Sequence, residues 1–158
     1  MATSSKSGGM PSARGVPHLA RTLSLAGAIP FVAGAVLLWV GSVGGLSGDF
    51  VSSALKGYSA VILSFLGGVH WGLALSARDP GSRDRELLFS IVPALVGWIA
   101  ILFASKTALM VLAIAFLLQG LFDIWMALKD HAPNWYARLR AEMTAVVCVV
   151  LLVAWAAL

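Results

Sequence analysis

The chain has 158 residues, of which 59% are hydrophobic and only 11% are charged. Soluble domains carry about 25% charged residues, so this composition leaves too little polar surface for a water-soluble fold and indicates a lipid bilayer as the surrounding solvent. The formal net charge of +4 comes from short clusters of Lys and Arg between apolar runs, without a stripe of basic and aromatic residues, which favours membrane topology over nucleic-acid binding.

Residues 1–22 come before the first apolar run. They are rich in Ser, Gly and Pro and contain no acidic residue. A segment of this composition cannot bury enough apolar surface to offset the entropy of ordering it, so we predict a disordered tail. The rest of the chain, residues 23–158, is predicted to form one membrane domain.

Five apolar runs make up this domain, at residues 23–43, 55–75, 87–105, 107–126 and 141–158. A helix that spans a bilayer needs about 20 apolar residues, within a range of about 17–25. The fifth run reaches this length only if it begins at Leu139 or Ala141, which places Glu142 near the interface. Glycine, proline and polar residues separate the runs, with a tight turn expected at residues 105–107. The sequence therefore predicts an all-α integral membrane bundle of five transmembrane helices, with a re-entrant pair as the alternative for the third and fourth runs.

The distribution of Lys and Arg predicts the orientation. The tail and the second and fourth loops carry three each, the first and third loops carry one each, and the C-terminus carries none. Cytoplasmic loops of membrane proteins are enriched in these cations. We therefore expect a multi-pass protein of a bacterial inner membrane with its N-terminus in the cytoplasm and its C-terminus in the periplasm. For a mitochondrial inner-membrane protein the matrix replaces the cytoplasm.

This threading brings four polar residues to one depth near the cytoplasmic face. His70 and Asp123 lie near the ends of the second and fourth runs, Gln119 lies one turn deeper than Asp123, and Glu142 lies at the start of the fifth. Polar groups at membrane depth usually face the bundle interior and pair with one another. We hypothesise that His70 hydrogen-bonds Asp123, with Gln119 as a further partner.

A purely structural interpretation remains open beside this one. Asp123 then reaches the interface or pairs with Lys129, and His70 bonds a neighbouring carbonyl. Trp71 and Trp125 lie near the cluster and fit an aromatic belt at the same interface.

Small residues in the second run predict close helix packing. Ala60, Ser64, Gly68, Gly72 and Ser76 recur every four residues and form one ridge, while Gly67 lies on the side of His70. The residues assigned to helix packing are Ser64, Gly67, Gly68 and Gly72.

No residue pattern indicates catalysis, a metal or a cofactor. His70 is the one histidine inside an apolar run and Cys148 is the one cysteine, so neither a haem with two histidine ligands nor a zinc site has enough ligands. We find no motif of a nucleotide-binding protein, hydrolase or metalloprotease, which favours a non-enzymatic protein over an enzyme.

Five segments together resemble a known family: IPF at 29–31, AVILSFLGGVHWG at 60–72, VPA at 92–94, LQGLFD at 118–123 and NWYARLR at 134–140. The family is a small bacterial inner-membrane family of unknown function, related to an animal mitochondrial transmembrane protein. The resemblance implies a multi-span membrane protein and marks His70, Trp71, Gln119, Asp123 and 135–136 as defining positions. It brings no established activity.

Three functions remain open on the sequence. The first is an accessory or assembly component of a membrane complex, with a membrane-protein partner or a second copy of the chain. The second is a small transporter or proton-coupled permeability protein that uses His70, Gln119 and Asp123. The third is a membrane enzyme or a protein that binds a lipid or a quinone.

Overall fold

The structure, a computed structural model, describes residues 16–41, 44–76, 80–129 and 134–158. These residues form five helices: α1 (His18–Val40), α2 (Gly48–Ser76), α3 (Pro80–Ile101), α4 (Ser105–Leu128) and α5 (Asn134–Ala156). The described part of the chain contains no β-strand. The prediction of an all-α membrane bundle of five helices is confirmed.

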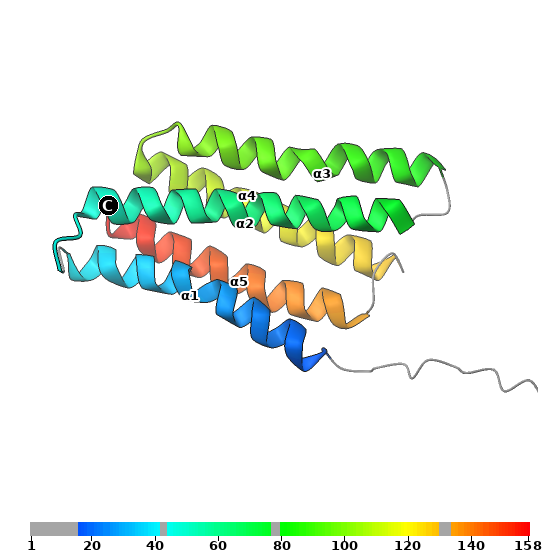
Figure 1. Cartoon of the computed structure of the whole chain (residues 1–158), viewed down its shortest axis with the longest axis horizontal. Coiled ribbons are helices and arrows are strands. Elements are labelled where there is room, and N and C mark those ends of the chain that lie inside the picture. The colour runs from blue at the N-terminus through cyan, green and yellow to red at the C-terminus, as the bar shows by residue number, and fades with distance from the viewer. Residues whose placement is uncertain (1–15, 42–43, 77–79, 130–133) are drawn as a thin grey trace, which may run out of the picture.

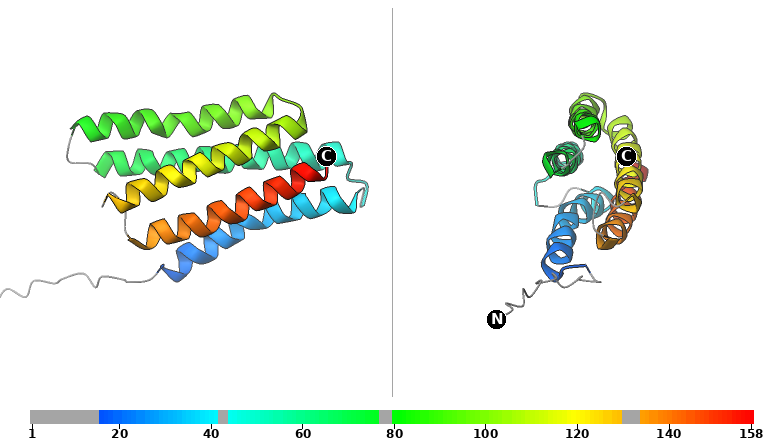
Figure 2. Two further views of the ribbon diagram at one scale, coloured as in Figure 1. Left: turned by 180° about the vertical axis from the view of Figure 1, so that it is seen from behind. Right: turned by 90° about the vertical axis from the view of Figure 1, so that its right-hand side faces the viewer.

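Successive helices run antiparallel because short connections join them (Figure 1). At the right-hand end of Figure 1, α1, α3 and α5 begin and α2 and α4 end; we call this the polar end. The C-terminus lies at the other end, which we call the opposite end. Seen end-on in Figure 2, α3 and α1 occupy the two extremes of an elongated cross-section. Helix α2 packs most extensively against α3, and α4 packs against α5.

Four helices, α1, α2, α4 and α5, are long and apolar enough to cross a membrane. Helix α3 carries four charged residues at 83–86, so its apolar part covers only residues 87–101. At 1.5 Å per residue this part is about 22 Å long, shorter than a hydrocarbon core of about 30 Å. Helix α3 nevertheless returns the chain from the end of α2 to the start of α4, so it connects the two ends of the bundle.

The helices begin and end at places that differ from the apolar runs. Helix α1 already begins at His18, while residues 1–15 of the predicted tail lie outside the described residues. The turn expected at residues 105–107 was wrong, because α3 ends at Ile101 and Ser105 is already helical. The observed turn lies at residues 102–104, and hydrogen bonds from α2 stabilise it. Lys56 donates to the carbonyl of Phe103 at 3.3 Å, and Ser52 and Ser105 share a hydroxyl hydrogen bond of 3.0 Å.

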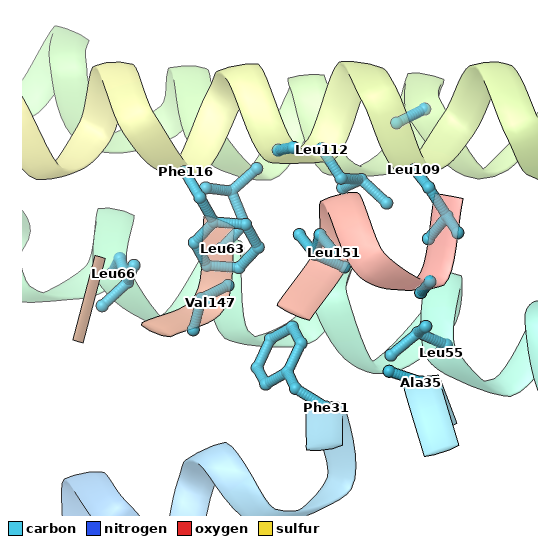
Figure 3. Close-up of a cluster of buried hydrophobic side chains, with 13 residues drawn as sticks. Phe31, Ala35, Leu55, Leu63, Leu66, Leu109, Leu112, Phe116, Val147 and Leu151 are labelled. Carbon is cyan, nitrogen blue, oxygen red and sulfur yellow. The ribbon is translucent and has the colours of Figure 1, made fainter. Parts of the chain in front are cut away.

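An apolar core fills the middle of the bundle (Figure 3). Phe31 of α1, Leu63 of α2, Phe116 of α4 and Leu151 of α5 meet there, each at most 2% exposed. The Phe31 ring stands edge-on to Phe116, with 5.7 Å between centroids. This core separates the buried polar groups of the polar end from those of the opposite end.

The helix pair α2–α3 makes its closest approach at Gly67 and Gly97, and of the predicted ridge Ala60 takes part, whereas Gly68 and Gly72 do not. A side chain on Gly67 would overlap the backbone carbonyl oxygen of Ser90, and one on Gly97 would meet Ala60 at 3.2 Å. A β-carbon on Gly68 or Gly72 would meet no atom within 4 Å. Neighbouring residues on a helix differ by about 100°, so the face through Gly67 turns toward α3 and the ridge through Gly68 turns outward.

Ser64, the other residue assigned to packing, uses its side chain within α2. Its hydroxyl donates to the carbonyl of Ala60 at 2.8 Å. A second close approach, between α4 and α5, occurs where a side chain on Gly120 would overlap Thr144. These two contacts bring α2, α3, α4 and α5 close together around the polar end.

Candidate functional site

Four polar side chains from three helices are buried near the polar end; we call His70, Gln119, Asp123 and Arg140 the polar cluster. They are 1%, 9%, 1% and 8% exposed. Gln119 and Asp123 lie one turn apart on one face of α4, while His70 comes from α2 and Arg140 from α5. Counted at 1.5 Å per residue, they lie about 8 to 14 Å from the helix ends at the polar end.

Asp123 is the centre of this cluster. Its Oδ1 lies 2.6 Å from Nε2 of His70 and accepts a hydrogen bond of 2.9 Å from Nε2 of Gln119. Its Oδ2 accepts one of 2.5 Å from Nε of Arg140. A carboxylate accepts only, so His70 carries its proton on Nε2 and donates it to Asp123. The contact of 2.8 Å between Gln119 and His70 then joins two donors that share one acceptor oxygen.

The charges of the cluster compensate each other. A single charge in a low-dielectric interior is costly, and buried charges therefore occur in pairs with further hydrogen bonds. The carboxylate of Asp123 and the guanidinium of Arg140 form such a pair, and two more donors saturate the carboxylate. The cluster thus links α2, α4 and α5 without a net charge while His70 is neutral.

Two other atoms of the same region lack a partner. Nδ1 of His70 and Oε2 of Glu86 are buried without a hydrogen-bond partner in the described part of the chain. Glu86 is 4% exposed and lies one turn before Ser90, which faces Gly67. In an antiparallel pair this register puts Glu86 near the level of His70.

Glu142 does not belong to the polar cluster, which corrects the sequence-based hypothesis. It forms ion pairs with Arg21 at 3.8 Å and Arg138 at 3.7 Å, and its side chain is 41% exposed. The sequence placed Glu142 close to the depth of the cluster. Glu142 lies two residues after Arg140, however, so about 200° of helix rotation separates their side chains. Arg140 faces α4, and Glu142 faces α1.

The predicted aromatic neighbours lie at the rim. Trp71 and Trp125 are 48% and 45% exposed. Lys129 stands 4.4 Å from the Trp125 ring centre and does not pair with Asp123. Two aromatic residues contact the cluster: Tyr136 lies against Asp123, and Phe122 packs on His70 with 5.1 Å between ring centroids and on Phe89 of α3 with 5.2 Å.

A groove of about 420 Å³ lies between α3 and α4 beside the polar cluster; we call it the α3–α4 groove. Its walls are apolar apart from Gln119. Phe89, Val92 and Leu118 line it and are 46%, 49% and 61% exposed, so the groove opens sideways into the bilayer. Gln119 is therefore shared by the groove and the cluster.

A second groove, of about 370 Å³, lies on the other side of the cluster; we call it the α1–α5 groove. Residues of α1, α2, α4 and α5 line it. It also opens sideways, because Leu23 and Phe65 in its wall are 63% and 67% exposed. Its polar end is lined by Arg140, Tyr136 and Thr144.

Arg140 is the member of the cluster that sequence reasoning missed. It was counted as a loop cation, since it precedes the fifth apolar run. The shortness of that run was the available signal, because a span that begins at Leu139 includes Arg140 in the helix. Glu86, Tyr136 and Thr144 offered no comparable signal, because their environment depends on neighbouring helices. Among the described residues, no group of three His, Cys, Asp or Glu side chains could hold a metal ion.

A bundle with four helices of membrane-spanning length and a buried polar cluster defines an all-α integral membrane protein. The chain belongs to the family described as "Protein of unknown function (DUF3429)", which matches residues 16–156. The resemblance to a family of unknown function, made on the sequence, is thereby confirmed.

Two animal proteins are similar to this chain, and both are called "Transmembrane protein 69". The one from Xenopus tropicalis is 38% identical over 131 residues, which cover 82% of this chain and 51% of the relative. The one from Mus musculus is 33% identical over 131 residues, covering 82% and 52%. The chain thus spans about half the length of the curated relatives it matches. No solved structure matches.

Proposed function

We propose that this protein binds an amphiphilic molecule dissolved in the bilayer, with the apolar part in the α3–α4 groove and a small polar head at Gln119. The observation that carries this proposal is the shared position of Gln119, which lines the groove and hydrogen-bonds the buried Asp123. The groove opens sideways, so a ligand enters from the lipid phase without crossing the interface.

The depth of Gln119 selects the kind of head group. Gln119 lies about 14 Å from the end of α4, well below the level of phospholipid head groups. A phosphate cannot be desolvated there without a charged partner, whereas a ring carbonyl or hydroxyl needs only one or two hydrogen bonds. The chemistry therefore favours a quinone or another neutral lipid with one or two oxygen atoms.

Gln119 has the hydrogen-bonding capacity for such a head group. Its amide nitrogen carries two protons, and one is donated to Asp123. The second proton and the carbonyl oxygen of the same amide serve a ligand that accepts or donates. Asp123 holds this amide in place, which lowers the entropy cost of binding.

The two other functions considered on the sequence find less support. Buried polar side chains of the described residues gather at the two ends of the bundle, and the apolar core around Leu63 and Phe116 separates them. This separation argues against a polar path through one copy of the chain. An accessory role with a membrane-protein partner, or a second copy, stays a prediction.

We further propose that the polar end faces the cytoplasm, or the matrix in a mitochondrion. Nine of the eleven Lys and Arg residues lie in the tail, in the two connections at this end or in the first turns of α1, α3 and α5. Single cysteines at Ser5 and Leu158, introduced into a Cys148→Ser background, test the orientation with a membrane-impermeant maleimide on intact cells. Labelling at position 158 alone supports it, and labelling at position 5 alone or at both positions refutes it.

The ligand is tested by extraction from purified protein. We expect the wild type, purified in mild detergent, to release a neutral lipid-soluble compound in about one copy per chain, detected by mass spectrometry. Ala115 lines the groove, so Ala115→Phe fills it and removes the compound. Ala145→Phe, at an exposed position on α5, serves as the matched control and retains it. Equal amounts in both variants, or no compound in the wild type, would reject the proposal.

A further inference from the structure

The α1–α5 groove differs chemically from its neighbour, because it contains a guanidinium group. Arg140 lines this groove and is 8% exposed. Within the described residues, its one hydrogen bond to another side chain goes from Nε to Asp123. A guanidinium has five N–H donors, so most of the donors of Arg140 do not bond a side chain of the described residues.

A second polar group in the same groove has no partner. Oγ1 of Thr144 is buried without a hydrogen bond to any described residue, and Thr144 is 8% exposed. Thr144 lies one turn deeper than Arg140 on α5 and also lines the groove, while its side chain packs closely against Gly120 of α4. Tyr136 lies next to Arg140 and Asp123 and completes the polar end of the groove.

The charges around the groove favour an anion. Three guanidinium groups, those of Arg21, Arg138 and Arg140, are balanced by only two carboxylates, Asp123 and Glu142. Asp123 balances Arg140, so the surplus positive charge belongs to Arg21 and Arg138, which share Glu142 at the polar end, where head groups meet acyl chains. Arg is suited to phosphate because its planar fork donates two parallel hydrogen bonds.

The rest of the groove is apolar, which indicates a lipid as the source of this anion. Leu23, Phe31, Leu66 and Val147 line the groove beyond Thr144, and its open side faces the bilayer. A free phosphate ion would leave this surface unfilled, whereas an acyl chain would cover it.

We propose that the α1–α5 groove is a binding site for one anionic phospholipid. The phosphate lies at Arg140 and Tyr136, and an acyl chain passes Thr144 and fills the groove as far as Phe31. This site is separate from the α3–α4 groove and does not depend on the neutral ligand proposed there.

The experiment compares two glycine variants with the same new side chain. Gly27 lines the groove, and a β-carbon there meets only the Tyr58 hydroxyl, at 3.9 Å, so Gly27→Leu enters the groove without a backbone clash. Gly68→Leu is the matched control, since a β-carbon at this exposed position meets no atom within 4 Å. Binding of phosphatidylglycerol and phosphatidylcholine from mixed micelles is measured by native mass spectrometry.

Both lipids carry the same phosphate, and phosphatidylcholine differs by a choline cation, which the surplus positive charge at Arg21 and Arg138 repels. We therefore expect the wild type and Gly68→Leu to prefer phosphatidylglycerol by about two- to fivefold. Gly27→Leu loses the preference. Equal binding of the two lipids by the wild type, or unchanged binding by Gly27→Leu, overturns the proposal. Displacement of the lipid by millimolar inorganic phosphate also overturns it, since the groove would then recognise the ion alone.

The midpoint of thermal unfolding in lipid-free detergent guards against misfolding of Gly27→Leu. We expect it to lie within a few degrees of the midpoint of Gly68→Leu, because neither new side chain meets the backbone of another helix. A folded Gly27→Leu that binds phosphatidylglycerol as the wild type does contradicts the proposed geometry.

Discussion

The two grooves share the polar cluster as a common wall but present different chemistry to the bilayer. The α3–α4 groove reaches the cluster through the neutral amide of Gln119, about 14 Å from the helix end. The α1–α5 groove reaches it through the cation of Arg140, about 9 Å from the helix end. The deeper groove therefore suits a neutral ligand and the shallower one suits an anion. A single buried carboxylate, Asp123, positions both groups.

The largest expected effect comes from removing this shared carboxylate. Asp123→Leu leaves Arg140 buried without its counter-charge and His70 without its acceptor. Breaking a buried ion pair from one side costs about 3–5 kcal/mol. We expect a strongly lowered midpoint of thermal unfolding in detergent and loss of ligand from both grooves.

A double substitution separates the pair from the rest of the cluster. Asp123→Leu with Arg140→Leu removes both charges, so part of the lost stability returns. If the double variant is as unstable as the sum of the two single variants, Asp123 and Arg140 are not coupled and the grooves have no common wall.

A smaller effect on stability is expected at the contact between α2 and α3. Gly67→Ala places a methyl group against the Ser90 carbonyl and forces the helices apart, which we expect to cost about 1–3 kcal/mol. Gly68→Ala, one residue later on the outward face, is expected to change stability by less than about 0.5 kcal/mol. Denaturation of both variants in the same detergent measures the difference. A reversed order would mean that the predicted ridge through Gly68 makes the contact after all.

Gln119→Leu separates the two grooves more finely. The variant loses one hydrogen bond to Asp123, worth about 1 kcal/mol, and the polar group of the α3–α4 groove. We expect extraction to yield less of the neutral compound, while phosphatidylglycerol binding stays at the wild-type level. Parallel loss of both ligands would show that the grooves are one site.

The smallest effect on stability is expected for Thr144→Val. The hydroxyl has no partner among the described residues, so its removal sacrifices no hydrogen bond and relieves an unsatisfied buried group. The free energy of unfolding without lipid should change by less than about 0.5 kcal/mol, or rise slightly. Destabilisation by 1 kcal/mol or more would reveal a partner for Oγ1.

The polar cluster shows which parts of a membrane site are readable in a sequence. His70 and Asp123 were placed at one depth because hydrophobic runs set where helices cross and each residue adds 1.5 Å. Gln119 was assigned to the same cluster because it lies four residues before Asp123, and residues four apart share a helix face. Arg140 was missed because a cation next to an apolar run resembles a loop residue. Glu142 was assigned to the cluster on depth alone, and its face of α5 turned out to be toward α1.

By itself the sequence determined the solvent, the helical fold, the succession of crossings and the depth of each polar residue. These properties are local: they follow from runs of apolar side chains and from the constant rise of a helix. Only the tertiary structure decided the facing of each helix, the choice of Gly67 and Gly97 as contact points, the entry of Arg140 into the cluster and the two grooves. Those features depend on how whole helix surfaces fit together, and a rotation of one residue, about 100°, is enough to exchange a buried face for an exposed one.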